Sequence, residues 1–380
     1  MSNLFDYLTW RGDLSFGNAS LSPVDALIFA MLTYMNFEGI VPSGAAADPV
    51  RLSDAAHAYF ARPAVAEGSI DSNHERLLRT LARSGRFSSL RMFGARKTLN
   101  RADGIQFGAV SFLLPGQNIF VAFEGTDDTL IGWKEDFRMS YECPVPAQLS
   151  AVEYLREIAA AHPLRRIYVG GHSKGGNLAM YAAVNAGDHL RYRIRAVYNN
   201  DGPGFCDSTL TGAAYLEMRD RIFTYLPQSS IVAVLLEHDT NYKIVQSSNK
   251  GLMQHDGYSW EVLGNDFVYT EERTAFGKRT EAIVDHFVSV TSPERRRRFC
   301  EALFSILEAS EQDTVSGILS GKRQSLRSIM SAYADLPDEV RTLLTETLAV
   351  LGEYQRSQKA TRKDKAGAKE LPVVNREKSS

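Results

Sequence analysis

The sequence predicts an α/β protein, in which a mostly parallel sheet is flanked by helices, with a helical region before the sheet and more helices after it. Three observations lead to this fold class. Short apolar runs alternate with helical periodicities through the middle of the chain, as in βαβ crossovers. A glycine-rich turn at residues 170–176 joins one such run to a helix. Of the 380 residues, 44% are hydrophobic, which supplies a sizeable core and excludes a wholly disordered chain.

The N-terminal region, residues 1–90, is expected to be helical and to pack on the core. Ser22 and Pro23 offer an N-cap and a proline in the first turn, and apolar residues follow at helical spacing as far as Met35. A second helical pattern covers residues 75–93, with a break expected at residues 84–85. No cluster of candidate catalytic residues stands out in this region.

Residues 91–290 form the predicted α/β core, because apolar runs and helical patterns take turns along them. Strands are expected at residues 105–113, 118–123, 166–169, 194–198, 222–226 and 242–245. Helices are expected at residues 147–161, 174–185, 215–219, 231–236 and 277–290. This alternation predicts a largely parallel sheet.

Residues 291–354 are expected to close the fold with helices at 293–309 and 338–354. The tail, residues 355–380, carries eight Lys/Arg against three Asp/Glu and almost no large apolar residues, which predicts disorder. Its positive charge would suit a weak contact with an anionic membrane surface.

Charge and cysteine content exclude several classes of protein. The chain has 43 Lys+Arg against 45 Asp+Glu, and this balance argues against a nucleic-acid binder. Cys143, Cys206 and Cys300 lie far apart, so neither a zinc ribbon nor a disulfide-stapled secreted scaffold is expected. The first residues have no apolar signal segment, and no run of about 18 apolar residues occurs. We therefore expect a soluble, cytoplasmic protein.

The strongest functional signal is the pattern G-x-S-x-G at Gly171, Ser173 and Gly175. The pattern follows an apolar strand and opens a helix, which is the setting that presents a nucleophilic serine on a sharp turn. The N–H of Lys174 would then point at a developing oxyanion from the helix N-terminus. A simple helix cap at Ser173 is the plainer alternative. A P-loop is excluded, because no lysine followed by Ser or Thr closes this turn.

A second signal lies upstream, where a strand ends at residues 118–123 and a short helix follows around Trp133. An acyl-transferring serine enzyme needs a second oxyanion donor from such a loop, and Thr126 offers an N–H and a hydroxyl. Thr126 could instead cap the short helix. Trp133 and Phe137 form an apolar stripe, which indicates either core packing or a lid over an acyl site.

These motifs together resemble the class 3 lipases of the α/β-hydrolase superfamily, and more closely a bacterial family related to them. The resemblance spans roughly residues 1–290 and is carried by WRGD at 10–13, FEGTD at 123–127, GHSKGGN at 171–177, NNDGPG at 199–204 and QHD at 254–256. It implies an α/β-hydrolase fold, Ser173 as nucleophile, His255 as base, and Thr126 and the Lys174 N–H as oxyanion donors. No particular substrate is implied.

The chain departs from these lipases at two positions. They usually carry Arg before the glycine of the oxyanion loop, whereas this chain has Glu124. Their triad aspartate follows a later strand, whereas residues 225–230 here contain no acid. Another carboxylate must therefore serve, or the triad lacks its acid.

The histidine and the acid of a triad should follow Ser173 in the order acid, then histidine. His255 follows the strand at 242–245 and a loop, where the last strand would deliver a base, and His238 is its rival. For the acid we favour Asp201, which directly follows a strand and precedes a Gly-Pro-Gly turn. Glu237 and Asp239 are the alternatives.

The sequence thus predicts a serine hydrolase that cleaves lipid or acyl esters with Ser173, His255 and Asp201 and needs no metal or organic cofactor. A thioesterase or peptidase on the same fold is one alternative, because a fold does not fix a substrate. A catalytically silent binding protein is another, and the sequence does not indicate an oligomeric state.

Overall fold

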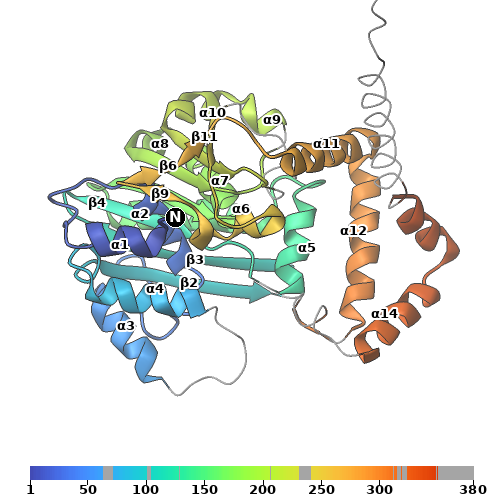
Figure 1. Ribbon diagram of the computed structural model, residues 1–380, viewed down its shortest axis with the longest axis horizontal. Helices are drawn as coiled ribbons and strands as arrows, with labels where there is room; N and C mark the ends of the chain where they lie inside the picture. Colours follow the sequence, from blue (N-terminus) through green and yellow to red (C-terminus); the bar gives the residue numbers. More distant parts are fainter. Residues whose placement is uncertain are drawn as a thin grey trace, which may run out of the picture.

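A nine-stranded sheet runs through the part of the chain described by the computed structural model, in the order β1-β2-β3-β4-β5-β6-β7-β8-β11 (Figure 1). The described residues are 1–62, 72–100, 104–127, 129–205, 207–230, 241–310, 312–314, 318, 323–347 and 349. The strands are β1 (Val50–Arg51), β2 (Arg91–Asn100), β3 (Ile105–Leu114), β4 (Asn118–Phe123), β5 (Arg166–His172), β6 (Ile194–Asn200), β7 (Ile222–Pro227), β8 (Tyr242–Val245) and β11 (Tyr269–Thr270). Two short strands, β9 (Val262–Leu263) and β10 (Asp266–Phe267), pair separately.

The centre of the sheet is parallel from β4 to β8, and both edges are antiparallel. The predicted α/β-hydrolase-like fold class is confirmed. Phe123 of β4 pairs with Gly171 of β5, and His172 pairs with Asn200 of β6. The carboxyl ends of the three strands therefore meet at one edge, where doubly wound sheets place their functional residues.

Residues 91–100 form β2, although the sequence predicts helix as far as residue 93. The preceding helix already ends at Arg83. The strand is buried over its first half and largely exposed over its second, so it lacks the alternation that marks a half-buried strand. Pairing with β3 along most of its length determines its conformation.

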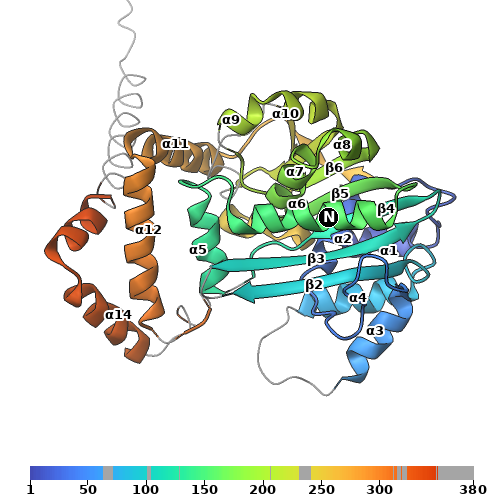
Figure 2. The same cartoon turned by 180° about the vertical axis from the view of Figure 1, so that it is seen from behind.

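Helices cover both faces of the sheet, as Figures 1 and 2 show from opposite sides. On one face, α2 packs against β4, β5 and β6, with α1 and α4 around it, and on the other face α6 and α7 pack against the sheet. Apart from α5, which is described below, the first ten helices in the described part of the chain are α1 (Leu4–Arg11), α2 (Pro23–Leu32), α3 (Leu52–Ala61), α4 (Ser72–Arg83), α6 (Pro146–Ala161), α7 (Lys174–Val184), α8 (Asp188–Arg193), α9 (Asp207–Leu210) and α10 (Ala213–Met218).

Strand β4 shows how one sequence serves both apolar layers. Phe120 and Ala122 pack with the α2 layer, whereas Ile119, Val121 and Phe123 pack with the α6 and α7 layer. All five side chains are fully buried. Because successive side chains of a strand point to opposite faces, a continuous apolar run marks a strand covered on both sides.

Helix α2 begins where the sequence predicts it. Ser22 accepts a hydrogen bond from the N–H of Asp25, while Asp25 accepts one from the N–H of Ser22, which is a capping box. Asp25 is fully buried, and its charge is paired with Arg86 at 2.6 Å and hydrogen-bonded by the Tyr7 hydroxyl at 2.8 Å. This buried group ties the segment after α4 to α1 and α2.

The C-terminal helices lie beside α5 (Leu130–Arg138), at the carboxyl end of the parallel strands. They are α11 (Ala275–Val290), α12 (Pro293–Glu308) and α14 (Arg323–Asp335). Helix α12 packs on α5 through Phe304 and Phe137, whose ring centroids are 5.7 Å apart. Residues 338–347 are helical as expected, whereas the helix predicted at 231–236 and the tail at 355–380 lie outside the described residues.

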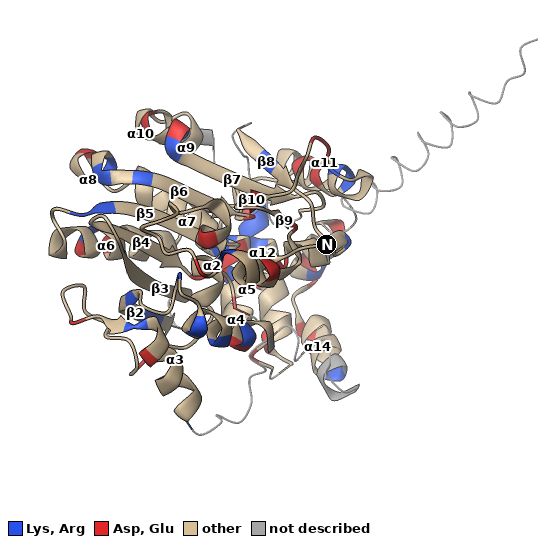
Figure 3. Cartoon of the chain, turned by 60° about the vertical axis from the view of Figure 1, so that its left-hand side comes forward, with Lys and Arg blue, Asp and Glu red and all other residues tan. Residues whose placement is uncertain are grey.

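Positively and negatively charged residues both occur along the helices and strands (Figure 3). This distribution agrees with the formal net charge of -2. Within the described part of the chain, none of the helices combines the length and the apolar character needed to cross a membrane.

Candidate active site

Ser173 lies on a sharp turn between β5 and α7 and has a positive φ of 57°. The turn is tight enough to require glycine on both sides. A Cβ at Gly171 would overlap the carbonyl group of Gly175, and a Cβ at Gly175 would overlap the carbonyl oxygen of Phe123. The N–H of Ser173 donates to the carbonyl oxygen of Asn200 at 2.9 Å. Neighbouring strands therefore hold the strained conformation in place.

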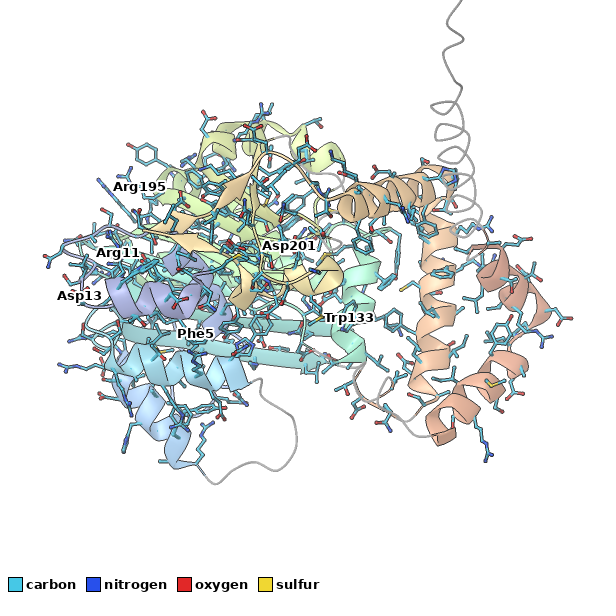
Figure 4. All side chains as sticks on the ribbon, viewed as in Figure 1. Phe5, Arg11, Asp13, Trp133, Arg195 and Asp201 are labelled. Carbon is cyan, nitrogen blue, oxygen red and sulfur yellow. The ribbon has the colours of Figure 1, made fainter. Side chains whose placement is uncertain are left out.

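Asp201 and His255 lie in contact. Oδ2 of Asp201 is 2.6 Å from Nδ1 of His255, which ends the 3₁₀ turn η3 (Gly251–His255). Asp201 directly follows β6, is fully buried, and has a positive φ of 54°. Its N–H donates to the carbonyl oxygen of Tyr225 at 2.8 Å, and its other carboxylate oxygen accepts a short hydrogen bond from the Ser230 hydroxyl. Figure 4 labels Asp201 near the centre of the view.

The rival residues divide into two groups. His238, Glu237 and Asp239 lie outside the described residues. Asp256 begins the short turn η4 (Gly257–Ser259), where its side chain accepts a hydrogen bond from the N–H of Tyr258 at 3.0 Å. The catalytic roles of Ser173, His255 and Asp201 remain predictions.

The loop after β4 lies beside the elbow. A Cβ added at Gly125 would lie 3.1 Å from the Cβ of Ser173. Thr126 does not cap α5, which corrects that alternative, because the N-cap is Thr129. The Thr126 hydroxyl donates instead to Oδ2 of Asp136 at 2.5 Å. The backbone N–H of Thr126 has no part in this hydrogen bond.

Asp136 is a buried carboxyl group behind the loop. Burial raises its pKa to about 6, while the Lys174 charge and the hydrogen bond from Thr126 oppose the rise. Oδ1 of Asp136 is buried and has no hydrogen-bond partner among the described residues. Above a pH of about 6, Asp136 is a carboxylate that accepts the hydrogen bond from the Thr126 hydroxyl. The hydroxyl must therefore turn away from Asp136 to donate to another oxygen.

The Lys174 side chain makes a contact that the sequence analysis does not predict. Its ammonium group lies 2.9 Å from Oε2 of Glu135 on α5, and both side chains are fully buried. The carbonyl oxygen of Gln106 accepts from the same ammonium group at 2.9 Å, and Oε1 of Glu135 accepts from the N–H of Ala147 at 3.0 Å. Moving α5 away would leave two buried charges unpaired, at a cost of several kcal/mol. This pair favours core packing over a mobile lid, although Trp133 remains 40% exposed (Figure 4).

Glu124 stands where the lipases usually carry arginine, and it forms an ion pair with Lys97. Its carboxylate lies 2.7 Å from Nζ of Lys97 on β2, and burial raises its pKa while Lys97 lowers it. A Cβ at Gly108 of β3 would overlap this carboxylate, so only glycine fits at that position of the neighbouring strand. Gln106 also donates to the carbonyl oxygen of Gly125 at 3.2 Å. The loop after β4 is thus held from β2 and β3.

The loop that carries His255 is held by side chains that form hydrogen bonds with its main-chain carbonyl oxygens. Nε2 of His172 lies 2.8 Å from the carbonyl oxygen of His255, and Nδ1 of His172 lies 3.0 Å from the Tyr34 hydroxyl. Trp260 donates to the carbonyl oxygen of Gln254 at 2.9 Å. The motif G-H-S contains His172, but nothing in the sequence indicates its partners.

No metal site is evident in the described ranges, where no three His, Cys, Asp or Glu side chains group as metal ligands. Cys143 is exposed, whereas Cys300 is buried. Burial raises the pKa of the Cys300 thiol to about 11, so the thiol stays protonated near neutral pH. Cys206 lies outside the described residues.

Several solved lipase structures are similar to this chain at low sequence identity. A deletion variant of the Rhizomucor miehei lipase with its propeptide is 15% identical, with a TM-score of 0.34, and the match covers 53% of this chain and 65% of that lipase. The chain thus spans slightly less than two thirds of that lipase. The lipase of Rhizopus microsporus var. chinensis is 12% identical, with a TM-score of 0.33 and 54% and 72% of the two chains covered. A triacylglycerol lipase described as having a serine protease triad at its catalytic centre is also 12% identical, with a TM-score of 0.35 and coverage of 59% and 80%.

Sequence comparison decides the family. No match is found among curated proteins. The model of the Mbeg1-like family matches residues 81–305, which is more than half of the chain and includes the turn at Ser173, the loop after β4 and the Asp201–His255 contact. The chain therefore belongs to the Mbeg1-like family, a lipase-like family.

Proposed function

We propose that this protein is a serine hydrolase that cleaves carboxylic esters of acyl or lipid type. The observation that carries the proposal is the 2.6 Å contact between Asp201 and His255, at the same sheet edge as the elbow of Ser173. A carboxylate at Nδ1 holds an imidazole in the tautomer whose Nε2 can accept a proton. A serine on a glycine-flanked strand–helix turn is the matching nucleophile.

In the proposed reaction, Oγ of Ser173 attacks the ester carbonyl carbon while His255 takes the hydroxyl proton. His255 then gives that proton to the leaving alcohol as the carbon–oxygen bond breaks, which leaves an acyl group on Ser173. In the second half, His255 takes a proton from water as the oxygen of that water attacks the acyl carbon. His255 then returns the proton to Oγ of Ser173 as the bond between Oγ and the acyl carbon breaks and the acid leaves. The N–H groups of Thr126 and Lys174 would stabilise the negative oxygen of each tetrahedral intermediate.

Reaction with a fluorophosphonate tests the proposal directly. We expect one stoichiometric adduct, which mass spectrometry of tryptic peptides should locate on Ser173. Ser150→Ala, on the outer helix α6, is the matched control and should be labelled like the wild type. Absence of any adduct on Ser173 in folded protein would favour a silent binding protein.

Esters of graded length then identify the substrate class. Nitrophenyl esters from acetate to palmitate, with a thioester and a peptide nitroanilide beside them, separate the alternatives by kcat/KM. A maximum at long acyl chains supports a lipid ester, whereas faster thioester or peptide cleavage supports an acyl hydrolase of another kind.

A further inference from the structure

The contacts of His172 fix the position of its ring proton. A carbonyl oxygen only accepts, so Nε2 of His172, 2.8 Å from the carbonyl oxygen of His255, must carry the proton and donate. The other nitrogen, Nδ1, is then an acceptor. It faces the Tyr34 hydroxyl at 3.0 Å, which therefore donates to it.

Tyr34 comes from outside the α/β core, two residues beyond the end of α2. Burial and the nearby charge of Glu124 raise its pKa well above the usual value, so it keeps its hydroxyl proton. Its ring also stacks on His74 of α4, with centroids 5.1 Å apart. Nδ1 of His74 lies 2.7 Å from the hydroxyl of Tyr258, three residues beyond His255. The segment after α2 thus contacts His172, and helix α4 contacts Tyr258, close to the loop of the proposed base.

His172 lies beside His255, whose ring gains a positive charge in the proposed reaction. The rings of His172 and His255 lie 4.6 Å apart between centroids. Burial lowers the pKa of His172 well below its usual value, and the proximity of His255 lowers it further. His172 therefore stays neutral when His255 takes a proton, and it does not repel the imidazolium that forms.

We propose that His172, oriented by Tyr34, is a positioning residue that holds the main chain of His255 and thereby aims its imidazole at Ser173. The N-terminal region supplies part of the site, although the family match begins only at residue 81. This inference rests on the proposed function, because it assigns His255 the role of base. It adds the source of the base's rigidity, which Asp201 alone does not provide, since Asp201 holds only the ring.

Three variants test the positioning role. His172→Phe keeps a buried ring but removes the donor to His255, and Tyr34→Phe removes the hydroxyl that fixes the tautomer. His172→Gln restores an amide N–H near the place of Nε2. We expect kcat to fall about tenfold or more in His172→Phe, with a smaller loss in Tyr34→Phe and little change in KM. His172→Gln should recover part of the loss.

The matched control is His162→Phe. His162 also places Nε2 3.0 Å from a carbonyl oxygen, that of Ala45, and burial lowers its pKa too, but it lies away from the site. We expect wild-type kcat for this variant. An unchanged kcat in His172→Phe, or an equal loss in His162→Phe, would overturn the inference.

Nitrogen-15 NMR of the histidine rings gives a readout that needs no turnover. In the wild type, His172 should show a protonated Nε2 and an unprotonated Nδ1, and Tyr34→Phe should weaken that preference. The ring signals of His255 should move in His172→Phe and stay in place in His162→Phe. Unmoved His255 signals would overturn the inference. Lack of ester cleavage in the wild type would instead count against the proposed function and leave this test intact.

Discussion

The carboxylate of Asp201 and the imidazole of His255 meet at 2.6 Å although 54 residues separate them in the chain. Asp201 reaches this contact because β6 ends at Asn200 and the next residue turns with a positive φ. His255 reaches it from η3, which follows β8. The contact identifies the pair that mutagenesis should address first.

Ser173→Ala should abolish ester hydrolysis and leave the fold intact. The change removes the nucleophile but adds no bulk to the elbow, and loss of a triad serine costs on the order of 10⁴-fold or more in kcat. Hydrolysis of nitrophenyl butyrate, with circular dichroism as a check on folding, measures the effect. Wild-type turnover by the alanine variant would exclude Ser173 as the nucleophile.

Asp201→Asn should lower kcat by about 10⁴-fold, because the amide keeps the shape but removes the charge that stabilises the imidazolium. Asp256→Asn is the matched control, since Asp256 adjoins His255 but caps η4, and it should retain activity. Glu237→Gln and Asp239→Asn should also retain activity. A larger loss in either of these two than in Asp201→Asn would move the acid to the other site.

Thr126→Val should reduce kcat by about tenfold or more with little change in KM, through loss of a hydroxyl donor to the oxyanion. The loss should stay below that of Ser173→Ala, because the backbone N–H survives. Thr129→Val provides the contrast. It removes the N-cap of α5 and should cost about 1 kcal/mol of stability without a comparable fall in kcat. An unchanged kcat in Thr126→Val would show that the Thr126 hydroxyl only forms the hydrogen bond with Asp136 and does not donate to the oxyanion.

Lys174→Met should destabilise the protein by about 3–5 kcal/mol, because it leaves the Glu135 carboxylate buried without a cation. Pairing it with Glu135→Leu should restore much of the loss. The adjacent exposed pair is the control: Lys134 and Glu308 are 37% and 52% exposed, so Lys134→Met should cost under about 1 kcal/mol. Urea denaturation measures all four proteins, and equal losses in Lys174→Met and Lys134→Met would contradict the expectation.

Asp136 should give the stability a distinctive dependence on pH. Its folded pKa of about 6 exceeds the ordinary value of 3.8, so the folded state holds the proton more tightly. The stability that this group contributes is present at low pH and is lost as the pH rises through about 6. The difference in unfolding free energy between wild type and Asp136→Asn should therefore shift against the wild type from pH 4.5 to pH 7. A constant difference would show that the pKa of Asp136 is not raised.

Local patterns in the sequence are sufficient to predict the sharp turn at Ser173. Gly171, Ser173 and Gly175 lie within five residues, and the turn that they predict depends on backbone geometry alone. The contact between Tyr34 and His172 spans 138 residues and depends on how α2 packs across the sheet. No periodicity encodes such a meeting, so the sequence could not predict it.

Charged residues near the site show the same limit. The sequence predicts a role for the backbone N–H of Lys174, but the burial of its side chain against Glu135 follows from the position of α5. Likewise, the sequence shows Glu124 where the lipases usually carry arginine, but it does not indicate the partner Lys97, which comes from β2, a strand that the sequence does not predict. A single sequence gives the chemistry of a side chain but not its tertiary partners.

Ser173 and Asp201 share left-handed backbone angles, with φ of 57° and 54°. Such conformations cost non-glycine residues about 1–3 kcal/mol each. Glycine at either position would relieve that cost while removing the functional group. At these two points the fold therefore gives up stability to keep the side chains of the proposed site, and selection for thermostability alone would drive both positions towards glycine.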